Sequence, residues 1–258
     1  AAGMARGGYR PYFAVYSTFL QRAYDQIVHD VCLQNLPVCI LSDHVGLVGD
    51  DGKTHHGVLS VPMLMSIPNL TLLAPRDTRQ IRQAVRATLK LDGPCVVQYP
   101  KEGIEPYAQN VTGEPFAVGK WQTLIPGGQD AVILAYGRMT QNAIRASELL
   151  VQRGLSVGVI DCCSLKPLDM DCLRALFERR AKIVTIEEGE MIGGFGSEIA
   201  RVCVEENADA PVQIIGLENR FITHGSVPEL LRECGLTPEQ LADRIEEIAG
   251  DKESSHVG

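Results

Sequence analysis

The segment from Asp43 to Gly57, DHVGLVGDDGKTHHG, contains residue types that are suited to proton transfer. Asp51 and His55 lie four positions apart within it, and a histidine beside a carboxylate can shuttle a proton near neutral pH. The glycines of the segment allow tight turns and let the backbone approach a ligand closely. The segment predicts a ligand site or, if the spacing has no chemical meaning, a solvated surface turn.

A second polar cluster, YSTFLQRAYDQ from Tyr16 to Gln26, follows the apolar run PYFAVY. Phe19 lies in the first turn of the helix expected here, where its ring could stack on a flat heterocycle. The alternative is that Phe19 packs this helix against the sheet. Both clusters directly follow apolar strands, and α/β proteins place ligand sites in such loops because the rigid sheet fixes where they lie.

Short β-rich runs alternate with amphipathic runs along the whole chain. In the first half we expect strands at 11–17, 38–43, 70–76 and 95–100, and helices at 19–34, 59–66 and 77–91. In the second half we expect strands at 131–137, 156–163, 183–189 and 212–218, and helices at 140–153, 169–179, 196–207, 227–234 and 238–249. In the helix at 77–91, Ile81, Val85 and Leu89 repeat at helical spacing, which predicts its apolar face.

This alternation predicts an α/β fold with two three-layer α/β/α domains and mostly parallel sheets, because near-continuous apolar strands are typical of sheets covered on both faces. Residues 1–118 and 119–250 would form the two domains, and residues 251–258 a disordered tail. Pro, Gly and polar residues dominate from about Lys101 to Gly128. They indicate a linker with a short strand near Trp121.

The composition limits the classes of partner. Of the 258 residues, 45% are hydrophobic and 22% are charged, so the chain can bury a sizeable core. The net charge of −8 disfavours nucleic acid and an anionic membrane surface as partners, and no apolar run is long enough to span a bilayer. The eight cysteines form neither a CxxC pair nor a zinc-ligand spacing, so we expect free thiols in a reducing compartment and no metal site in this chain.

Two further features are weaker candidates for a site. Gly193, Gly194 and Gly196 precede an expected helix and look like a phosphate cradle, but their spacing is not GxGxxG, which disfavours a dinucleotide site. His56 neighbours His55, and alternation along the chain points its side chain elsewhere.

Motifs in both halves indicate one family. YSTFLQRAYDQ together with VGDDGKTHHG resembles the pyrimidine-binding domain of the 1-deoxy-D-xylulose-5-phosphate synthase family, thiamine-diphosphate enzymes of the transketolase superfamily. In the second half, IDCCSLKPLD, EEGEMIGGFGSEI and GLENRFITHGS resemble the transketolase C-terminal domain. The resemblance extends from Ala1 to about Ala249.

The resemblance implies that the complete enzyme condenses pyruvate with glyceraldehyde 3-phosphate, releases carbon dioxide and forms 1-deoxy-D-xylulose 5-phosphate, a precursor of isoprenoids, thiamine and pyridoxal. This chain would bind the pyrimidine side of thiamine diphosphate. The diphosphate and Mg²⁺ would bind to an N-terminal domain that this sequence lacks, and the catalytic glutamate of the family would lie a few residues before Ala1, so the chain alone would be inactive. The family also implies a homodimer in the bacterial cytoplasm, or in the plastid stroma if the source is a plant.

The resemblance also assigns roles to individual residues. Phe19 would stack on the aminopyrimidine of the cofactor, and Tyr16 would lie beside it. The catalytic residues that line the reaction space would be His55, Asp51 and Tyr16. The residues that bind the substrates would be Arg22, His44, Asp51 and Lys101.

His44 and Lys101 stand where the family usually has arginine. Lysine lacks the bidentate fork of arginine, and a neutral histidine binds phosphate more weakly still, so these departures affect the affinity for the acceptor. Two other hypotheses therefore stay open. The chain could be one subunit of a split transketolase-like enzyme whose partner supplies the diphosphate domain, or a non-catalytic, degenerate homologue.

Overall fold

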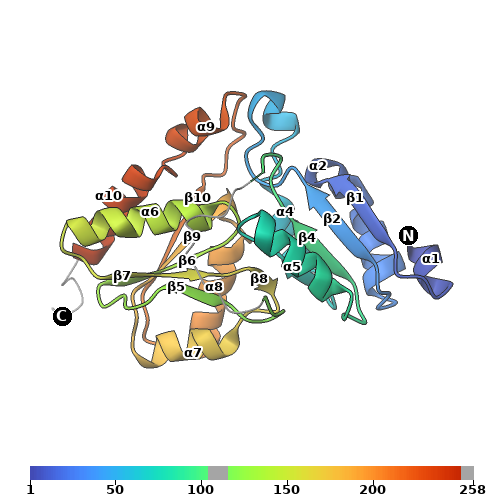
Figure 1. Ribbon diagram of the computed structural model, residues 1–258, viewed down its shortest axis with the longest axis horizontal. Coiled ribbons are helices and arrows are strands. Elements are labelled where there is room, and N and C mark those ends of the chain that lie inside the picture. Colours follow the sequence, from blue (N-terminus) through green and yellow to red (C-terminus); the bar gives the residue numbers. More distant parts are fainter. Residues whose placement is uncertain (104–115, 251–258) are drawn as a thin grey trace.

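The computed structural model describes residues 1–103 and 116–250, and two five-stranded sheets form its framework (Figure 1). The first sheet has the strand order β1-β2-β4-β3-β8, and the second has the order β10-β9-β6-β7-β5. The predicted tail at 251–258 and part of the predicted linker lie outside the described residues. No helix within the described ranges has the length and apolar character needed to cross a membrane.

Four strands of the first sheet run parallel, and the fifth comes from the other half of the chain. The parallel strands are β1 (Tyr12–Tyr16), β2 (Cys39–Asp43), β3 (Thr71–Leu73) and β4 (Cys95–Gln98). The fifth strand, β8 (Ser164–Lys166), pairs antiparallel with β3 and was not predicted. It is only three residues long and its partner is distant in the sequence, so no local pattern indicates it.

Helices cover both faces of the first sheet. The helical elements of this half are α1 (Ala2–Arg6), α2 (Ser17–Leu20), the 3-10 helix η1 (Gln21–Ala23), α3 (Tyr24–Gln26), the π-helix η2 (Ile27–Cys32), the 3-10 helix η3 (Gly49–Thr54), α4 (Ser60–Met65) and α5 (Thr78–Thr88). The helix predicted at 19–34 is thus a continuous but irregular helical stretch. Leu20, Ile27 and Leu64 pack on one face of the sheet, and Ala84 of α5 packs on the other.

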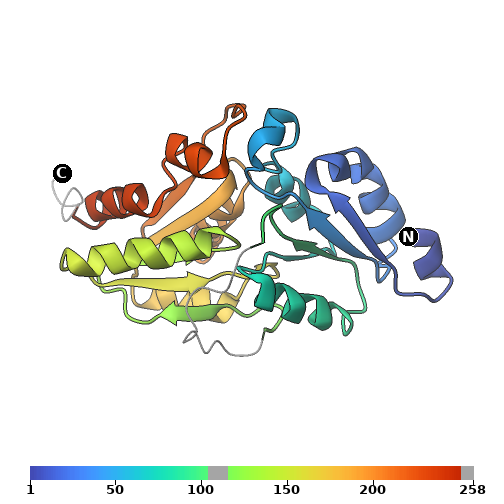
Figure 2. The same ribbon diagram turned by 45° about the horizontal axis from the view of Figure 1, so that its top comes forward.

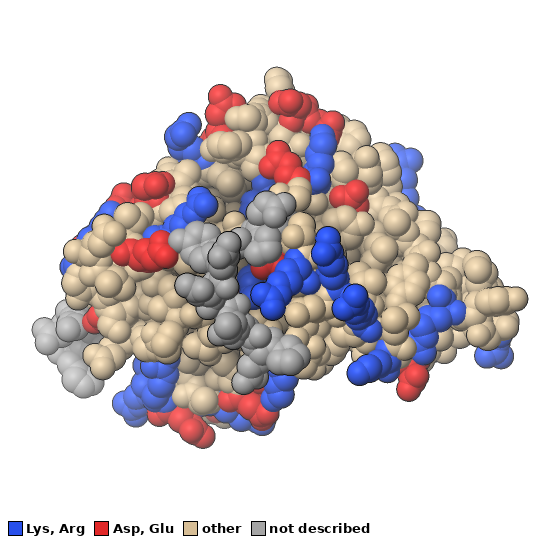
Figure 3. Space-filling model, in the orientation of Figure 1, with Lys and Arg blue, Asp and Glu red and all other residues tan. Residues whose placement is uncertain are grey.

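The buried face of α5 differs from the predicted one. Gln80, Ala84 and Thr88 are buried, whereas Leu89 is 56% exposed. The polar members of this face have partners, because Gln80 donates to Asp161 Oδ2 over 2.6 Å. Basic side chains gather over α5 on the face seen in Figure 3.

The second sheet also has helices on both faces. Its strands are β5 (Gln122–Ile125), β6 (Ala131–Ala135), β7 (Val157–Asp161), β9 (Ile183–Glu190) and β10 (Val212–Leu217). Its helices are α6 (Met139–Gln152), α7 (Met170–Glu178), α8 (Phe195–Glu205), α9 (Val227–Glu233) and α10 (Pro238–Gly250). Only β5, the short strand predicted near Trp121, runs antiparallel within this sheet. The predicted fold class, two α/β/α units with mostly parallel sheets, is confirmed.

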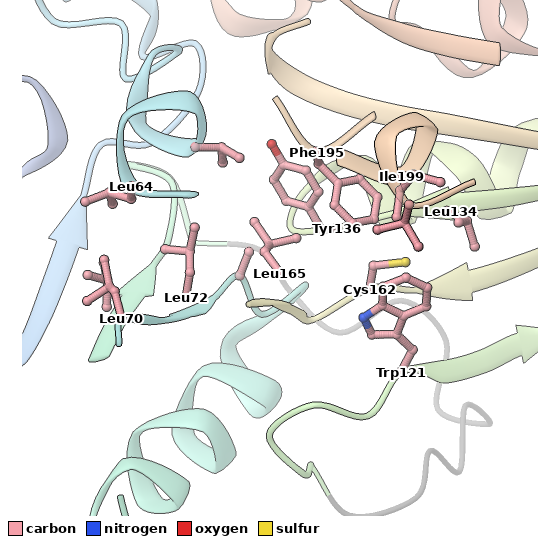
Figure 4. Packing of buried hydrophobic residues seen from close by; sticks show 14 of the residues in the cluster. Leu64, Leu70, Leu72, Trp121, Leu134, Tyr136, Cys162, Leu165, Phe195 and Ile199 are labelled. Carbon is pink, nitrogen blue, oxygen red and sulfur yellow. The ribbon is translucent and has the colours of Figure 1, made fainter. Parts of the chain in front are cut away.

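One hydrophobic cluster joins the two sheets. Leu165 of β8 lies between Leu72 of β3 and Tyr136, which follows β6 (Figure 4). Phe195 contacts Tyr136 edge to face, with 5.5 Å between the ring centroids. Trp121 donates its indole N–H to the carbonyl of Ser164 over 2.8 Å, which fixes the entry to β8. The two halves therefore share a core, and their relative position depends on it.

Replacing Leu165 by alanine is expected to destabilise the whole chain. The side chain is fully buried, and Leu→Ala changes in cores cost about 2–5 kcal/mol because a cavity remains. Urea unfolding followed by far-UV circular dichroism measures the change. Val204→Ala is the control, because Val204 is 77% exposed. Equal stability of the two variants would contradict the shared core.

Candidate active site

The predicted site residues follow three neighbouring parallel strands. β1, β2 and β4 are adjacent in the first sheet and end at Tyr16, Asp43 and Gln98. Tyr16 and Asp43 are paired in register, so their side chains and the loops after them start side by side. Because parallel strands place their carboxyl ends at one edge, the sheet brings together residues that are distant in the sequence.

Four rings form a continuous row at this edge. Tyr16 stacks on His44, with 3.6 Å between ring centroids, and on Phe19, with 5.3 Å. Phe19 meets His55 edge to face at 5.6 Å. Phe19 is 51% exposed, so half of its surface remains open to solvent. This exposure argues against the alternative that Phe19 only packs the helix against the sheet.

His44, at one end of this row, is fixed by several contacts. It is buried, and its carbonyl accepts a hydrogen bond from Ser17 Oγ over 2.8 Å. Its Nδ1 lies 2.9 Å from Asp43 Oδ1, but the two atoms are not aligned for a hydrogen bond. Because the ring is buried, stacked on Tyr16 and next to a carboxylate, His44 is poorly placed to act as a free cation for a phosphate.

Asp51 and Lys101 form an ion pair at the outer side of the site. Asp51 Oδ2 lies 2.5 Å from Lys101 Nζ, and this hydrogen bond lowers the pKa of Asp51 and raises the pKa of Lys101. Their side chains are 37% and 42% exposed, so solvent weakens the pair. Asp51 is therefore a carboxylate at neutral pH and can accept a hydrogen bond. The ammonium group of Lys101 is already paired with this carboxylate.

His55 is oriented by its neighbour Thr54. Thr54 Oγ1 lies 2.9 Å from His55 Nδ1, so Nε2 is the ring nitrogen that could exchange a proton with a ligand. His55 and Asp51 thus lie in one segment, as predicted, and His55 also contacts Phe19. Arg22 lies on η1 and is exposed. Among the described residues no hydrogen bond or ion pair joins Arg22 to the rest of the site.

The second half of the chain contacts the same segment, which sequence reasoning missed. His56 accepts a hydrogen bond from the Val48 N–H over 3.1 Å, and its Nε2 lies 2.9 Å from the carbonyl of Thr223. Glu188 accepts from the Leu47 N–H over 2.8 Å. Thr223 is 167 positions from His56 and Glu188 is 141 positions from Leu47, so only the packing of the two sheets indicates these two contacts.

The glycine-rich turn before α8 is filled by a side chain of the chain itself. Glu187 Oε2 accepts from the Phe195 N–H over 3.0 Å, and Oε1 accepts from the Gly196 N–H over 2.9 Å. A Cβ on Gly194 would overlap the Glu190 carbonyl oxygen and lie 2.6 Å from Glu187 Oε2, so close packing against both explains the glycine. The N-terminus of α8 thus binds an internal carboxyl group.

No three carboxylate, imidazole or thiolate groups converge as a metal site within residues 1–103 and 116–250. The cysteines are free, and most of them are buried.

Two family models match the chain in succession. The transketolase pyrimidine-binding domain matches residues 1–105, and the transketolase C-terminal domain matches residues 119–241. The chain belongs to the transketolase family. Within this family, the rings of the site lie in the part that matches the pyrimidine-binding domain, and Glu187 and Glu188 lie in the part that matches the C-terminal domain.

Within the transketolase family, the chain is similar to curated 1-deoxy-D-xylulose-5-phosphate synthases. The chain is 43% identical over 98% of its length to a 1-deoxy-D-xylulose-5-phosphate synthase from Geobacillus thermodenitrificans. It is 42% identical over 93% of its length to the synthase from Thermus thermophilus. These matches cover 40% and 38% of the two relatives, so the chain spans about two fifths of their length.

Solved structures of the transketolase family share the fold. One described as a split gene transketolase, inactive beta4 tetramer, superposes with a TM-score of 0.87 at 29% identity and covers 98% of this chain and 80% of that one. A transketolase mutant from Pichia stipitis superposes with a TM-score of 0.77 at 19% identity and covers 98% of this chain and 37% of that one. The arrangement of both sheets is therefore that of transketolases.

Glu187→Gln is expected to reduce the dependence of stability on pH. Burial raises the pKa of Glu187 to about 7, above its value in the unfolded chain. The folded state therefore binds this proton more tightly, and the contribution to stability is present at about pH 5 and is lost as the pH rises through 7. Its maximum is about 3 kcal/mol.

Urea unfolding at pH 5, 6, 7 and 8 measures this effect as the difference between wild type and variant. Glu178→Gln, at an exposed position of α7, is the control and should keep the wild-type slope. The same slope in Glu187→Gln as in the wild type would contradict a raised pKa.

Proposed function

We propose that this chain forms the pyrimidine-binding half of the active site, and the C-terminal domain, of a 1-deoxy-D-xylulose-5-phosphate synthase. The enzyme would condense pyruvate with glyceraldehyde 3-phosphate and release carbon dioxide. The observation that carries the proposal is the row of rings beside Asp51 at one edge of the first sheet, in a chain about 40% identical to curated synthases. We propose residues 1–118 and 119–250 as the two domains.

The residues at this edge fit the pyrimidine of thiamine diphosphate. Phe19 has an exposed aromatic surface, and Tyr16 stacks against it, so a flat heterocycle could continue the row. When bound, the cofactor supplies the electron sink for decarboxylation. We assign the diphosphate and Mg²⁺ to a separate N-terminal domain, because the glycine-rich turn of this chain already binds Glu187.

The remaining side chains would orient substrates and transfer protons. His55 would hold or accept a proton at Nε2, and the Asp51 carboxylate would accept a hydrogen bond from a substrate hydroxyl. Tyr16 would line the same space. Lys101 would contact the acceptor phosphate after exchanging its bond to Asp51, with Arg22 nearby as a second cation. His44 would contribute mainly through its stack on Tyr16.

A second candidate is one subunit of a split transketolase-type enzyme. The observation that favours it is the match to the split gene transketolase, of which this chain covers 80%. In this case a separate polypeptide would supply the diphosphate domain. Co-purification of a tagged chain with an N-terminal-type partner, or a continuous reading frame upstream of Ala1, distinguishes the two candidates.

We further propose that the enzyme is a homodimer that acts on small molecules and binds neither nucleic acid nor membrane. The free cysteines suit a reducing compartment, the bacterial cytoplasm or the plastid stroma.

His55→Ala in the complete enzyme is expected to lower kcat at least about a hundredfold, because positioned acid–base groups contribute about 10²–10⁴-fold. The melting temperature should change little, because the ring is only half-buried. The measurement is formation of 1-deoxy-D-xylulose 5-phosphate from pyruvate and glyceraldehyde 3-phosphate.

His29→Ala is the matched control, because the side chain of His29 is 63% exposed and its ring contacts only Asp25 among the ion pairs of the described residues. It should leave kcat unchanged. Wild-type turnover in His55→Ala would sink the assignment, and absence of any activity in the wild-type complete enzyme would favour a non-catalytic homologue.

A further inference from the structure

Leu47 of the first half is held entirely by the second half. Its side chain is fully buried in the hydrophobic cluster formed by β6, β7, β9, β10, α6 and α10. Its N–H donates to Glu188 Oε1 over 2.8 Å, and its carbonyl accepts from Arg138 Nη2 over 3.3 Å. The N–H and the C=O of Leu47 thus bind side chains of the second half, Glu188 on β9 and Arg138 at the start of α6, immediately before the segment that contains Asp51 and His55.

The two side chains that bind Leu47 also bind each other. Arg138 Nε lies 3.3 Å from Glu188 Oε2 in an ion pair without hydrogen-bond geometry, and the side chains are only 12% and 8% exposed. Arg138 Nη1 also lies 4.0 Å from Oε2 of the exposed Glu102. A buried ion pair is costly to break, because removal of one partner leaves an uncompensated charge. The ion pair therefore holds the Glu188 and Arg138 side chains in place, and their hydrogen bonds hold the backbone of Leu47.

Gly46 shows how closely the two halves approach. Its φ is +79°, and a Cβ at this position would lie 2.7 Å from Glu188 Cδ and 2.8 Å from Glu188 Oε2. Only glycine combines this backbone conformation with this contact. The carboxylate of Glu188 thus lies directly against the backbone of the site loop.

A second anchor holds the far end of the same segment. His56 Nδ1 accepts from the Val48 N–H, so Nε2 carries the proton and donates to the carbonyl of Thr223 over 2.9 Å. His56 is buried, and Thr223 lies in the loop between β10 and α9. Figures 1 and 2 both show the segment that contains η3 next to this loop. Asp51 and His55 lie between the two anchors.

We propose that Glu188 and Arg138 are positioning residues of the active site. They fix residues 47–56 against the second sheet, and this sets where Asp51 and His55 lie relative to Phe19. The second half therefore contributes to the site without touching the substrate. The effect on turnover rests on the proposed function, whereas the effect on the loop does not.

Hydrogen exchange of the chain, measured by mass spectrometry of peptides covering 45–57, tests the effect on the loop. Glu188→Gln removes the charge that pairs with Arg138 and should increase exchange at Leu47 and Val48 by about tenfold or more. Glu187→Gln is the matched control. It changes the adjacent buried carboxylate of β9, which binds the N-terminus of α8, and should leave exchange at 45–57 unchanged.

A double variant separates positioning from global stability. Glu188→Leu with Arg138→Met replaces the ion pair by apolar groups, which usually preserves stability. The melting temperature should then fall only modestly, because the N–H and C=O of Leu47 lose their partners, while exchange at Leu47 and Val48 still increases. Exchange at 45–57 that matches the Glu187→Gln control, or that increases uniformly over the whole chain, would overturn the proposal.

In the complete enzyme, Glu188→Gln should lower kcat about tenfold with a smaller change in KM, because the loop would no longer hold Asp51 and His55 in place. An enzyme that exchanges faster at the loop but keeps wild-type kcat would overturn the catalytic part of the proposal. A complete wild-type protein without synthase activity would count against the proposed function alone, because the exchange result does not depend on it.

Discussion

The pairing of β8 with β3 is the constraint on which the rest of the structure depends. It adds a strand from the second half to the first sheet, and Leu165 on that strand completes a core that neither half could form alone. With the two sheets fixed in this way, the loop after β2 meets the loops that follow β6 and β10. The site is therefore a property of the joined halves, although its rings all come from the first.

Within the site, local geometry decides which charges are available to a ligand. Lys101 shares its charge with Asp51, and His44 is enclosed by Tyr16 and Asp43. Neither residue therefore presents an isolated cation. An anionic substrate must therefore compete with an internal carboxylate for Lys101, whereas a flat, neutral ring meets an open aromatic surface at Phe19.

The sequence was sufficient for the architecture and for placing the candidate residues after neighbouring strands at one edge of the first sheet, because both depend on local patterns. Apolar strands alternating with helices predict parallel sheets, and the loops after β1 and β2 stand out through their polar residues. Contacts between residues that are distant in the sequence produce no local pattern from which they could be predicted. Glu188 and Leu47 are 141 positions apart, and Gln80 is buried against Asp161, which is 81 positions away.

The absence of a side chain at Gly46 limits which substitutions this chain can accept at positions 46 and 188. Any larger residue there would overlap the carboxylate of Glu188, and loss of that carboxylate would leave the amide of Leu47 without its acceptor and Arg138 without its buried counter-charge. A larger residue at position 46 would therefore require a change at position 188 as well. A chimera could join the first half of this chain to the second half of a relative. It would keep the position of the loop only if the relative also has a carboxylate at the position of Glu188, which faces Gly46.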